Sequence, residues 1–251
     1  MKNVYKNKDK DNIIIMETYY NNINIKENIT HVKLDIGLSY SAPYSQNWLE
    51  TEPNLLVIGF EPNPDFLSSI LSKDIIHKRE HCHGNPIDKK YVNERFFLFP
   101  VALSNVNEPT EMIFYETQKD VGCSSLYKPI DVNLGEYKIK SNVPVYSLKH
   151  FFDLFPFDKF EYIDYIKIDA QGSDLDILQS ADYYLKEKVV YITAEPESNS
   201  YENCSHNNEQ NIEKYLLSQN FIRVYNKNTC DPTYINKKFQ HLENEIYIFQ
   251  N

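Results

Sequence analysis

The sequence predicts an α/β fold, a doubly wound and mostly parallel sheet of about seven strands with an antiparallel last strand. Short apolar runs alternate along the chain with helix-like stretches, as expected when crossover helices join buried parallel strands. Acidic residues follow several of these runs, where the loops of such a sheet hold ligands. Because 251 residues can bury one large core, we expect a single domain over residues 1–251. Residues 1–28 are expected to form a partly flexible N-terminal extension.

The predicted strands and helices alternate from residue 32 onward. The strands are residues 32–36, 55–60, 96–103, 112–115, 143–146, 162–168, 189–194, 221–225 and 245–249. The helices lie around Trp48 and over residues 66–71, 148–155, 172–181 and 212–218. In the helix after Gly172, the apolar residues Leu175, Leu178 and Ala181 follow helical spacing.

Composition argues against a membrane-spanning or exported protein. Hydrophobic residues make up 41% of the chain, the mean hydropathy is −0.55, and no apolar run approaches the roughly 18 residues that a membrane helix needs. The polar start of the chain is followed by a short apolar run, residues 13–16, which is too short for a signal peptide. We expect a cytoplasmic protein without membrane insertion.

The net charge and the cysteine content indicate which partners and metal sites are not expected. A net charge of −10 repels polyanions, so nucleic acid is not an expected partner. The four cysteines, Cys82, Cys123, Cys204 and Cys230, form no CxxC pair, which favours free thiols over a zinc ribbon or a disulfide framework. The cluster of His77, His81, Cys82 and His83 is interpreted as a polar surface loop, so no metal site is expected.

Asp35, Gly37 and Glu61 have the layout of a nucleoside-binding half of an α/β sheet. Gly37 permits close approach of a ligand to the backbone, and Glu61 can accept hydrogen bonds from both hydroxyls of a ribose. The residues after Gly37 read Leu-Ser-Tyr-Ser-Ala and lack the glycines that cradle a diphosphate. This absence favours S-adenosylmethionine over NAD. The alternative is that Asp35 caps a turn and Glu61 is a solvated strand-end acid.

A succession of motifs resembles the FkbM-type methyltransferases. The motifs are Leu34-Asp35-Ile36-Gly37, Gly59-Phe60-Glu61-Pro62-Asn63-Pro64, Ala102-Leu103-Ser104-Asn105, Ser124-Ser125-Leu126 and the segment Ile166-Lys167-Ile168-Asp169-Ala170-Gln171-Gly172-Ser173-Asp174-Leu175. Their order and spacing are similar to that family over roughly residues 30 to 225. The resemblance implies a Rossmann-like methyltransferase fold, S-adenosylmethionine as methyl donor, and hydroxyl acceptors.

The resemblance also implies which residues bind the cofactor. Asp35 and Gly37 would hold the methionine end, Glu61 the ribose, and the backbone around Val101 and Ala102 the adenine. The cofactor-binding set further includes Ser39, Tyr40, Pro62 and Asn63. In this family the first loop usually reads D-V-G-A-N-x-G, whereas here Ser39 and Ser41 stand at the Asn and second Gly positions. We therefore expect the methionine end to be held differently.

Methyl transfer to a neutral hydroxyl needs an aligned oxygen and a base. Asp169 ends a central strand and is the predicted base; the alternative is that it caps the following helix. Glu195, at the end of the next strand, would share this role or position the acceptor, unless it is a solvated rim acid. His150 is a reserve base, although a surface position at a helix start is the alternative reading.

Four residues are predicted to bind the acceptor. Lys167 lies two residues before Asp169, so strand alternation points both to one side and lets the lysine orient the aspartate or form a salt bridge at the sheet edge. Ser124 and Ser125 have hydroxyls that suit a sugar, with an ordinary turn as the alternative. Glu197 adds a carboxylate near Glu195.

The sequence thus predicts an S-adenosylmethionine-dependent O-methyltransferase. Its acceptor would be a sugar, a glycan or another small hydroxylated molecule. Two other functions stay open: a noncatalytic S-adenosylmethionine-binding module, and an NAD-dependent sugar-modifying enzyme. Methylation of nucleic acid is disfavoured because the sequence lacks an N/D-P-P-Y motif.

Overall fold

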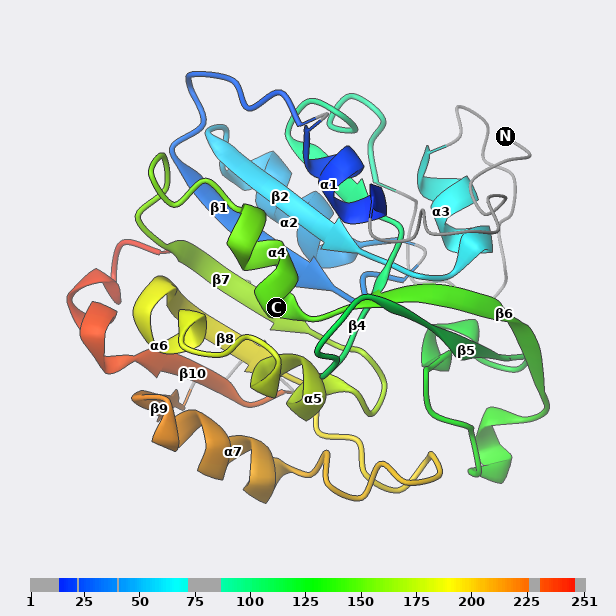
Figure 1. Ribbon diagram of the computed structural model, residues 1–251. Helices are drawn as coiled ribbons and strands as arrows, with labels where there is room; N and C mark the ends of the chain where they lie inside the picture. Colours follow the sequence, from blue (N-terminus) through cyan, green and yellow to red (C-terminus); the bar gives the residue numbers. More distant parts are fainter. Residues whose placement is uncertain (1–13, 22, 40, 72–86, 226–230, 247–251) are drawn as a thin grey trace.

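A computed structural model describes residues 14–21, 23–39, 41–71, 87–225 and 231–246 (Figure 1). Within these residues, seven strands form the main sheet in the order β3-β2-β1-β7-β8-β10-β9. Their bounds are β1 His31–Ile36, β2 Leu55–Phe60, β3 Phe96–Phe99, β7 Ile163–Ile168, β8 Val189–Ala194, β9 Phe221–Val224 and β10 Thr233–Asn236. The order reverses between β1 and β7, which are parallel neighbours, so the predicted doubly wound sheet is confirmed.

Helices cover both faces of this sheet, and alternating side chains of each strand feed two apolar cores. Leu34, Ile58 and Ile166 belong to one core and Val57 and Tyr165 to the other. Figure 1 shows α1, α4 and α5 in front of the sheet and α2 behind it. The helices are α1 Ile14–Asn21, α2 Pro43–Thr51, α3 Pro64–Leu71, α4 Leu148–Leu154, α5 Asp174–Gln179, α6 Tyr184–Lys188 and α7 Glu209–Ser218. The five predicted helices correspond to α2, α3, α4, α5 and α7.

A second sheet of three described strands lies beyond the carboxyl ends of the main sheet (Figure 1). Its order is β4-β6-β5, with β4 Ala102–Leu103, β5 Thr110–Thr117 and β6 Tyr137–Tyr146. The single strand predicted over residues 96–103 is therefore wrong. The chain leaves the main sheet at Pro100, which has no N–H to continue the ladder, and enters the second sheet at Ala102. The loop between β5 and β6 carries two short 3-10 helices, η1 Val121–Cys123 and η2 Val132–Leu134.

The last strand is antiparallel as predicted, but it is not the segment that was predicted. β10 pairs antiparallel with both β8 and β9. The proposed strand over residues 245–249 is wrong where it is described, since Glu245 lies in a turn and Ile246 in a bend that follow η3 Lys237–Leu242. Residues 247–249 lie outside the described residues. β10 has only four residues, too few to show a clear apolar period.

The N-terminal extension is packed onto the domain over part of its length. Met16 on α1 is 1% exposed and joins the core beside α4, and Ile23 and Ile25 pack against the same core. None of the described helices is long and apolar enough to cross a membrane.

Candidate active site

The carboxyl ends of β1, β2 and β7 bring three predicted residues to one edge of the sheet. Backbone hydrogen bonds continue past the strand ends: Gly37 N–H donates to Phe60 O at 3.0 Å, and Asp169 N–H donates to Ile36 O at 3.0 Å. Glu61 N–H likewise donates to Phe99 O at 3.2 Å. Gly37, Glu61 and Asp169 are thus held on the sheet itself rather than on free loops, which fixes the floor of a site at the point where strand order reverses.

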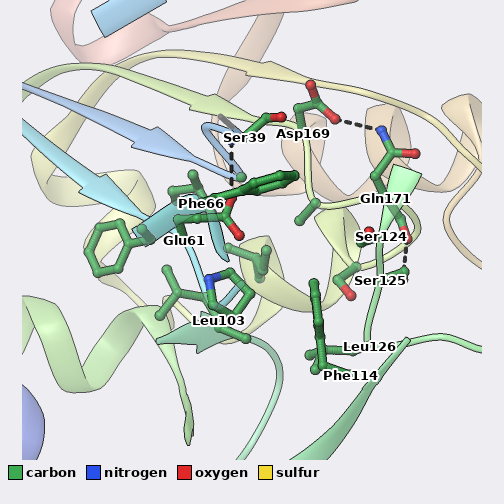
Figure 2. Close-up of a pocket in the computed structure, with 18 of the residues that line it drawn as sticks. Ser39, Glu61, Phe66, Leu103, Phe114, Ser124, Ser125, Leu126, Asp169 and Gln171 are labelled. Atoms are coloured by element: carbon green, nitrogen blue, oxygen red, sulfur yellow. Dashed lines mark hydrogen bonds between the residues drawn. The ribbon is translucent and has the colours of Figure 1, made fainter. Parts of the chain in front are cut away.

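A first cavity of about 530 Å³ lies over this edge. Its walls are largely apolar, with Glu61 and Asp169 as the acidic groups. Figure 2 shows the Phe66 ring beside Glu61, with Asp169 and Gln171 at one end of the view and Phe114 and Leu126 at the other. The predicted residues that line this cavity are Gly37, Ser39, Glu61, Pro62, Val101, Ala102, Ser124, Ser125 and Asp169.

A second cavity of about 890 Å³, open to solvent, adjoins the first. Both are lined by Gly37, Ser39, Val121, Gly122, Asp169 and Gln171. The second cavity is the more polar one, because Asp35, Lys167, Tyr44 and Asp120 also reach it. Asp169 therefore stands where an apolar chamber and a polar chamber meet.

Glu61 is a buried carboxylate fixed by backbone donors. It is 4% exposed, its Oε2 accepts from Ser39 N at 3.0 Å, and its Oε1 accepts from Asn63 N at 2.8 Å. Each oxygen keeps a further lone pair for a ligand hydroxyl. Burial raises the pKa of Glu61 to about 7, against the opposing effect of these two hydrogen bonds. Proton loss from Glu61 therefore falls in the neutral range.

Gly37 is required by the protein backbone and not only by a ligand. Its φ is +72°, and a Cβ built there would lie 1.9 Å from Asp169 O. The β1 and β7 loops approach each other more closely than any side chain permits. The sequence predicted that Gly37 lets a ligand approach the backbone; the close contact with Asp169 O is a second, structural reason for a glycine at this position.

Lys167 joins the acids of β1 and β7. Its ammonium lies 3.2 Å from Asp169 Oδ2 and 3.7 Å from Asp35 Oδ1, and it donates to Gly37 O at 3.3 Å. Burial alone would lower the pKa of Lys167, but the charges of Asp169 and Asp35 outweigh it and raise the pKa. The salt-bridge alternative for Lys167 is what the structure shows, and it also orients Asp169.

Asp35 is 1% exposed and has one satisfied oxygen. Oδ2 accepts from Ser45 Oγ at 2.6 Å, whereas Oδ1 has no hydrogen-bond partner in the described part of the chain. Burial raises the pKa of Asp35, and the Lys167 charge partly offsets that effect. A buried carboxylate oxygen without a donor is suited to a ligand cation or N–H.

Asp169 and Glu195 form a carboxyl pair bridged by Gln171. The Gln171 amide nitrogen donates to Asp169 Oδ1 at 2.7 Å and to Glu195 Oε2 at 2.8 Å. Burial would raise the pKa of Asp169, but the Lys167 charge and hydrogen bonds from Glu195 and Gln171 hold it below its usual range. Burial and the neighbouring Asp169 carboxylate raise the pKa of Glu195 strongly. These opposite shifts favour the negative charge on Asp169 and a proton on Glu195.

Asp169 does not cap α5. Ser173 occupies the N-cap position and makes no side-chain capping bond. The loop before α5 is instead held by Asp174, whose carboxylate accepts from Ala170 N at 3.1 Å and from Glu195 N at 2.9 Å. Asp169 is thus left facing the two cavities, with 36% of its side chain exposed.

Several predicted acceptor-binding residues lie elsewhere or have their polar groups engaged. Ser124 donates to Val121 O at 2.6 Å and Ser125 to Gln171 O at 2.7 Å, so their hydroxyls hold the loop over the first cavity. Glu197 lines neither cavity, and its Oε1 accepts from the backbone of Asn199 and Ser200 in a turn. Its predicted place beside the acceptor is not observed.

Three further predicted residues are accounted for differently. Asn63 lines neither cavity and donates to Glu116 Oε2 at 3.1 Å. His150 takes part in a capping box with Ser147 at the start of α4, which matches its surface alternative. Tyr40 and the cluster of residues 77–83 lie outside the described residues. Among the residues that are described, no group of three His, Cys, Asp or Glu side chains is arranged to hold a metal ion.

Sequence reasoning missed Gln171 and the apolar walls of the first cavity. Gln171 belongs to the same motif as Asp169, and its place two residues after a strand-end acid and directly before Gly172 was the available signal. Phe66, Leu103, Phe114 and Leu126 come from three separate segments. No local pattern links them, because only the packing of the second sheet brings them together.

The sheet order, the single antiparallel strand and the acid at the end of β2 define a Rossmann-like fold of the methyltransferase type. Residues 35–223 match the family model of the methyltransferase FkbM domain, so the chain belongs to the FkbM methyltransferase family. Methyltransferases of this kind generally use S-adenosylmethionine. A solved precorrin-6y C5,15-methyltransferase from Geobacter metallireducens GS-15 is a distant match, with TM-score 0.34, 14% identity and 94% of each chain covered. No curated protein matches the sequence.

We expect Gly37→Ala to destabilise the fold severely. The new methyl group would overlap Asp169 O at 1.9 Å and would sit at a positive φ, so the β1 and β7 loops must separate. Thermal unfolding measures the effect. Gly122→Ala is the matched control, because its Cβ would lie 3.2 Å from a flexible Asp120 oxygen and should change the melting temperature little. Equal melting temperatures for Gly37→Ala and the wild type would contradict the assigned contact.

Stability of the ligand-free protein should fall as pH rises from about 5 to about 7.5. Burial raises the folded-state pKa of Glu61 to about 7 and that of Asp174 to about 7. In this window the folded state binds more protons than the unfolded chain, so raising the pH favours unfolding. Chemical denaturation at several pH values tests this, and Glu61→Gln should flatten the slope. A stability that rises over the same window would show that these carboxyls are ionised in the folded state.

Proposed function

We propose that the protein is an S-adenosylmethionine-dependent O-methyltransferase acting on a hydroxyl of a sugar, a glycan or another small hydroxylated molecule. The observation that carries this proposal is the position of the Asp169 carboxylate, which is held by Lys167 and Gln171 at the junction of the two cavities. One cavity has the apolar walls and the strand-end acid that suit a nucleoside. The other has more polar walls, which suit a hydroxylated acceptor.

The residues of the site fit S-adenosylmethionine. Glu61 has free lone pairs for the ribose hydroxyls, and Val101, Ala102 and Phe114 offer apolar walls for the adenine. Asp35, with a buried oxygen that lacks a donor among the described residues, suits the ammonium of the methionine end, next to Gly37 and Ser39. The site has no glycine-rich turn for a diphosphate, which a dinucleotide would need.

Bound S-adenosylmethionine supplies a methyl group on a positively charged sulfur. The protein's part is to align the acceptor oxygen and receive its proton. Asp169 Oδ1 and Oδ2 are held by Gln171 and Lys167, so the carboxylate can accept the hydroxyl hydrogen without changing position. The raised pKa of Glu195, caused by burial and the Asp169 carboxylate, favours a donor role beside Asp169 over that of a second base.

The remaining expectations are part of the same proposal. We propose that residues 1–251 act as one methyltransferase domain in the cytoplasm, with neither nucleic acid nor a membrane as partner. The net charge of −10 supports this view, since a polyanion would be repelled. The acceptor is then a small or extended carbohydrate-like molecule that diffuses to the open cavity.

Glu61 should control cofactor affinity in a pH-dependent way. Ribose hydroxyls donate to the ionised carboxylate, so the affinity for S-adenosylhomocysteine should rise from pH 6 to pH 8 as Glu61 loses its proton, whose pKa is about 7. Glu61→Gln should weaken binding by about 1–3 kcal/mol and remove the pH dependence. Isothermal titration calorimetry measures both. Glu187→Gln, on the exposed ion pair with Lys238, is the control; equal affinity of the Glu61 variant and wild type would refute this cofactor placement.

Asp169→Asn and Glu195→Gln should differ sharply in turnover. The first removes the base and should slow methyl transfer by about 10² to 10⁴-fold, whereas the second copies a protonated carboxyl and should stay within about tenfold of wild type. Transfer of labelled methyl from S-adenosylmethionine to a panel of sugars and glycans measures the rates, and calorimetry with S-adenosylhomocysteine checks that both variants bind it. A larger loss in Glu195→Gln than in Asp169→Asn would exchange the two roles.

A further inference from the structure

The Gln171 side chain contacts three residues of the site. Its amide nitrogen donates to both Asp169 and Glu195, and its Oε1 shares the single hydrogen of the Tyr201 hydroxyl with Cys123 O, at 2.9 Å and 2.7 Å. An amide nitrogen carries two hydrogens, so one goes to each carboxyl. The reversed orientation would place Oε1 against Asp169 Oδ1 and Glu195 Oε2, so that oxygen would face oxygen at both contacts. The two carboxyls therefore favour this direction of the amide.

The backbone of Gln171 is held as firmly as its side chain. Its φ is +51°, in the left-handed region that residues other than glycine seldom occupy. Its carbonyl accepts from Ser125 Oγ at 2.7 Å, and Tyr201, which contacts its side chain, also reaches Cys123 O at 2.7 Å. Both partners tie Gln171 to the 121–125 segment, which lines both cavities. A strained conformation persists where surrounding contacts determine it, and such positions gather at functional sites.

We propose that Gln171 is a positioning residue for methyl transfer: by giving one amide hydrogen to each carboxyl, it holds the Asp169 carboxylate at the cavity junction and keeps Glu195 beside it. This inference rests on the proposed function for its role in catalysis. The arrangement of the pair itself is a property of the ligand-free protein.

The charges around the pair explain why it needs such a residue. Among the described residues, Lys167 on β7 is the cation that faces the Asp169–Glu195 pair. The other described titratable groups near the pair are Asp35 on β1, Glu61 on β2, Asp174 on α5, Asp231 before β10, and Tyr44, Tyr201 and Cys123. Two ionised carboxyls side by side in this acidic setting repel each other. Lys167 contacts Asp169 and not Glu195, so the charge belongs on Asp169. The amide donors stabilise that charge at a fixed position.

A purely structural role for Gln171 makes a different prediction. If Gln171 only shaped the turn between β7 and α5, replacing it would change stability and leave the proton distribution of the pair unchanged. If it is a positioning residue, the acid titration of Asp169 must move. Gln171→Met removes both donors at similar length, and Gln171→Glu replaces the amide with a third carboxyl. All three side chains are unbranched at Cβ, so the left-handed φ affects them similarly.

Carboxyl ¹³C NMR titration of the full chain without ligand tests the proposal. In the wild type, neither Asp169 nor Glu195 should titrate between pH 4.5 and 8. In Gln171→Met, the Asp169 midpoint should move upward by at least one pH unit, and in Gln171→Glu further still. Asp169→Asn and Glu195→Gln assign the two signals. Gln179→Met, at the exposed end of α5, is the control and should match the wild type.

An unchanged Asp169 titration in a folded Gln171→Met protein would overturn the proposal. If that variant fails to fold, Tyr201→Phe provides the second test, because it removes the hydroxyl that holds Gln171 Oε1 and should move the midpoint in the same direction by less. No movement in Tyr201→Phe would then count against the positioning role. Calorimetry with S-adenosylhomocysteine on the wild type is read separately: absence of binding would refute the proposed function and leave the titration result standing.

Discussion

The site depends on one buried cation. Lys167 is 7% exposed on its side chain and lies between the carboxylates of Asp35 and Asp169 while it bonds Gly37 O. A lysine without these partners would be strongly disfavoured at this depth. With them, it joins the β1 loop to the β7 loop and keeps a negative charge on Asp169. The ion pairs of Lys167 thus hold the ends of β1 and β7 together beneath the cavities.

The carboxyl groups around Lys167 lie close together, but their surroundings shift their pKa values in different directions. The Lys167 charge and nearby hydrogen bonds lower the pKa of Asp169, whereas burial and the Asp169 carboxylate raise the pKa of Glu195 strongly. Burial raises the pKa values of Glu61 and Asp174 to about 7, between these extremes. One sheet edge therefore carries carboxyls with lowered, near-neutral and strongly raised pKa values, although all are the same functional group.

Sequence patterns predicted the parts of this site that follow from strand ends. Asp35, Glu61 and Asp169 each follow a buried apolar run, and parallel strands in a doubly wound sheet bring such residues to one edge. Glu197 lines neither cavity, because its carboxylate accepts hydrogen bonds from the turn after β8. The contacts of Gln171 involve residues far along the chain, such as Tyr201. Contacts of this kind produce no periodic pattern in the sequence, so they could not be predicted from it. The sequence also did not predict β10 or the end of β3 before Pro100. Both depend on which sheet the chain joins, and this is decided by contacts between distant segments.

The departure of the chain from the main sheet at Pro100 has an architectural consequence. Val101, Ala102 and Leu103 form a wall of the first cavity, yet Ala102 and Leu103 pair with β6 of the second sheet. The floor of the cavity thus belongs to one sheet and this wall to another. Substitutions along β5 and β6 can widen or narrow the chamber while the strands that carry the acids stay in register. In this chain, the residues that carry the chemistry therefore lie on the main sheet, and a wall that limits the size of the ligand lies on the second sheet. Substitutions can change one without changing the other.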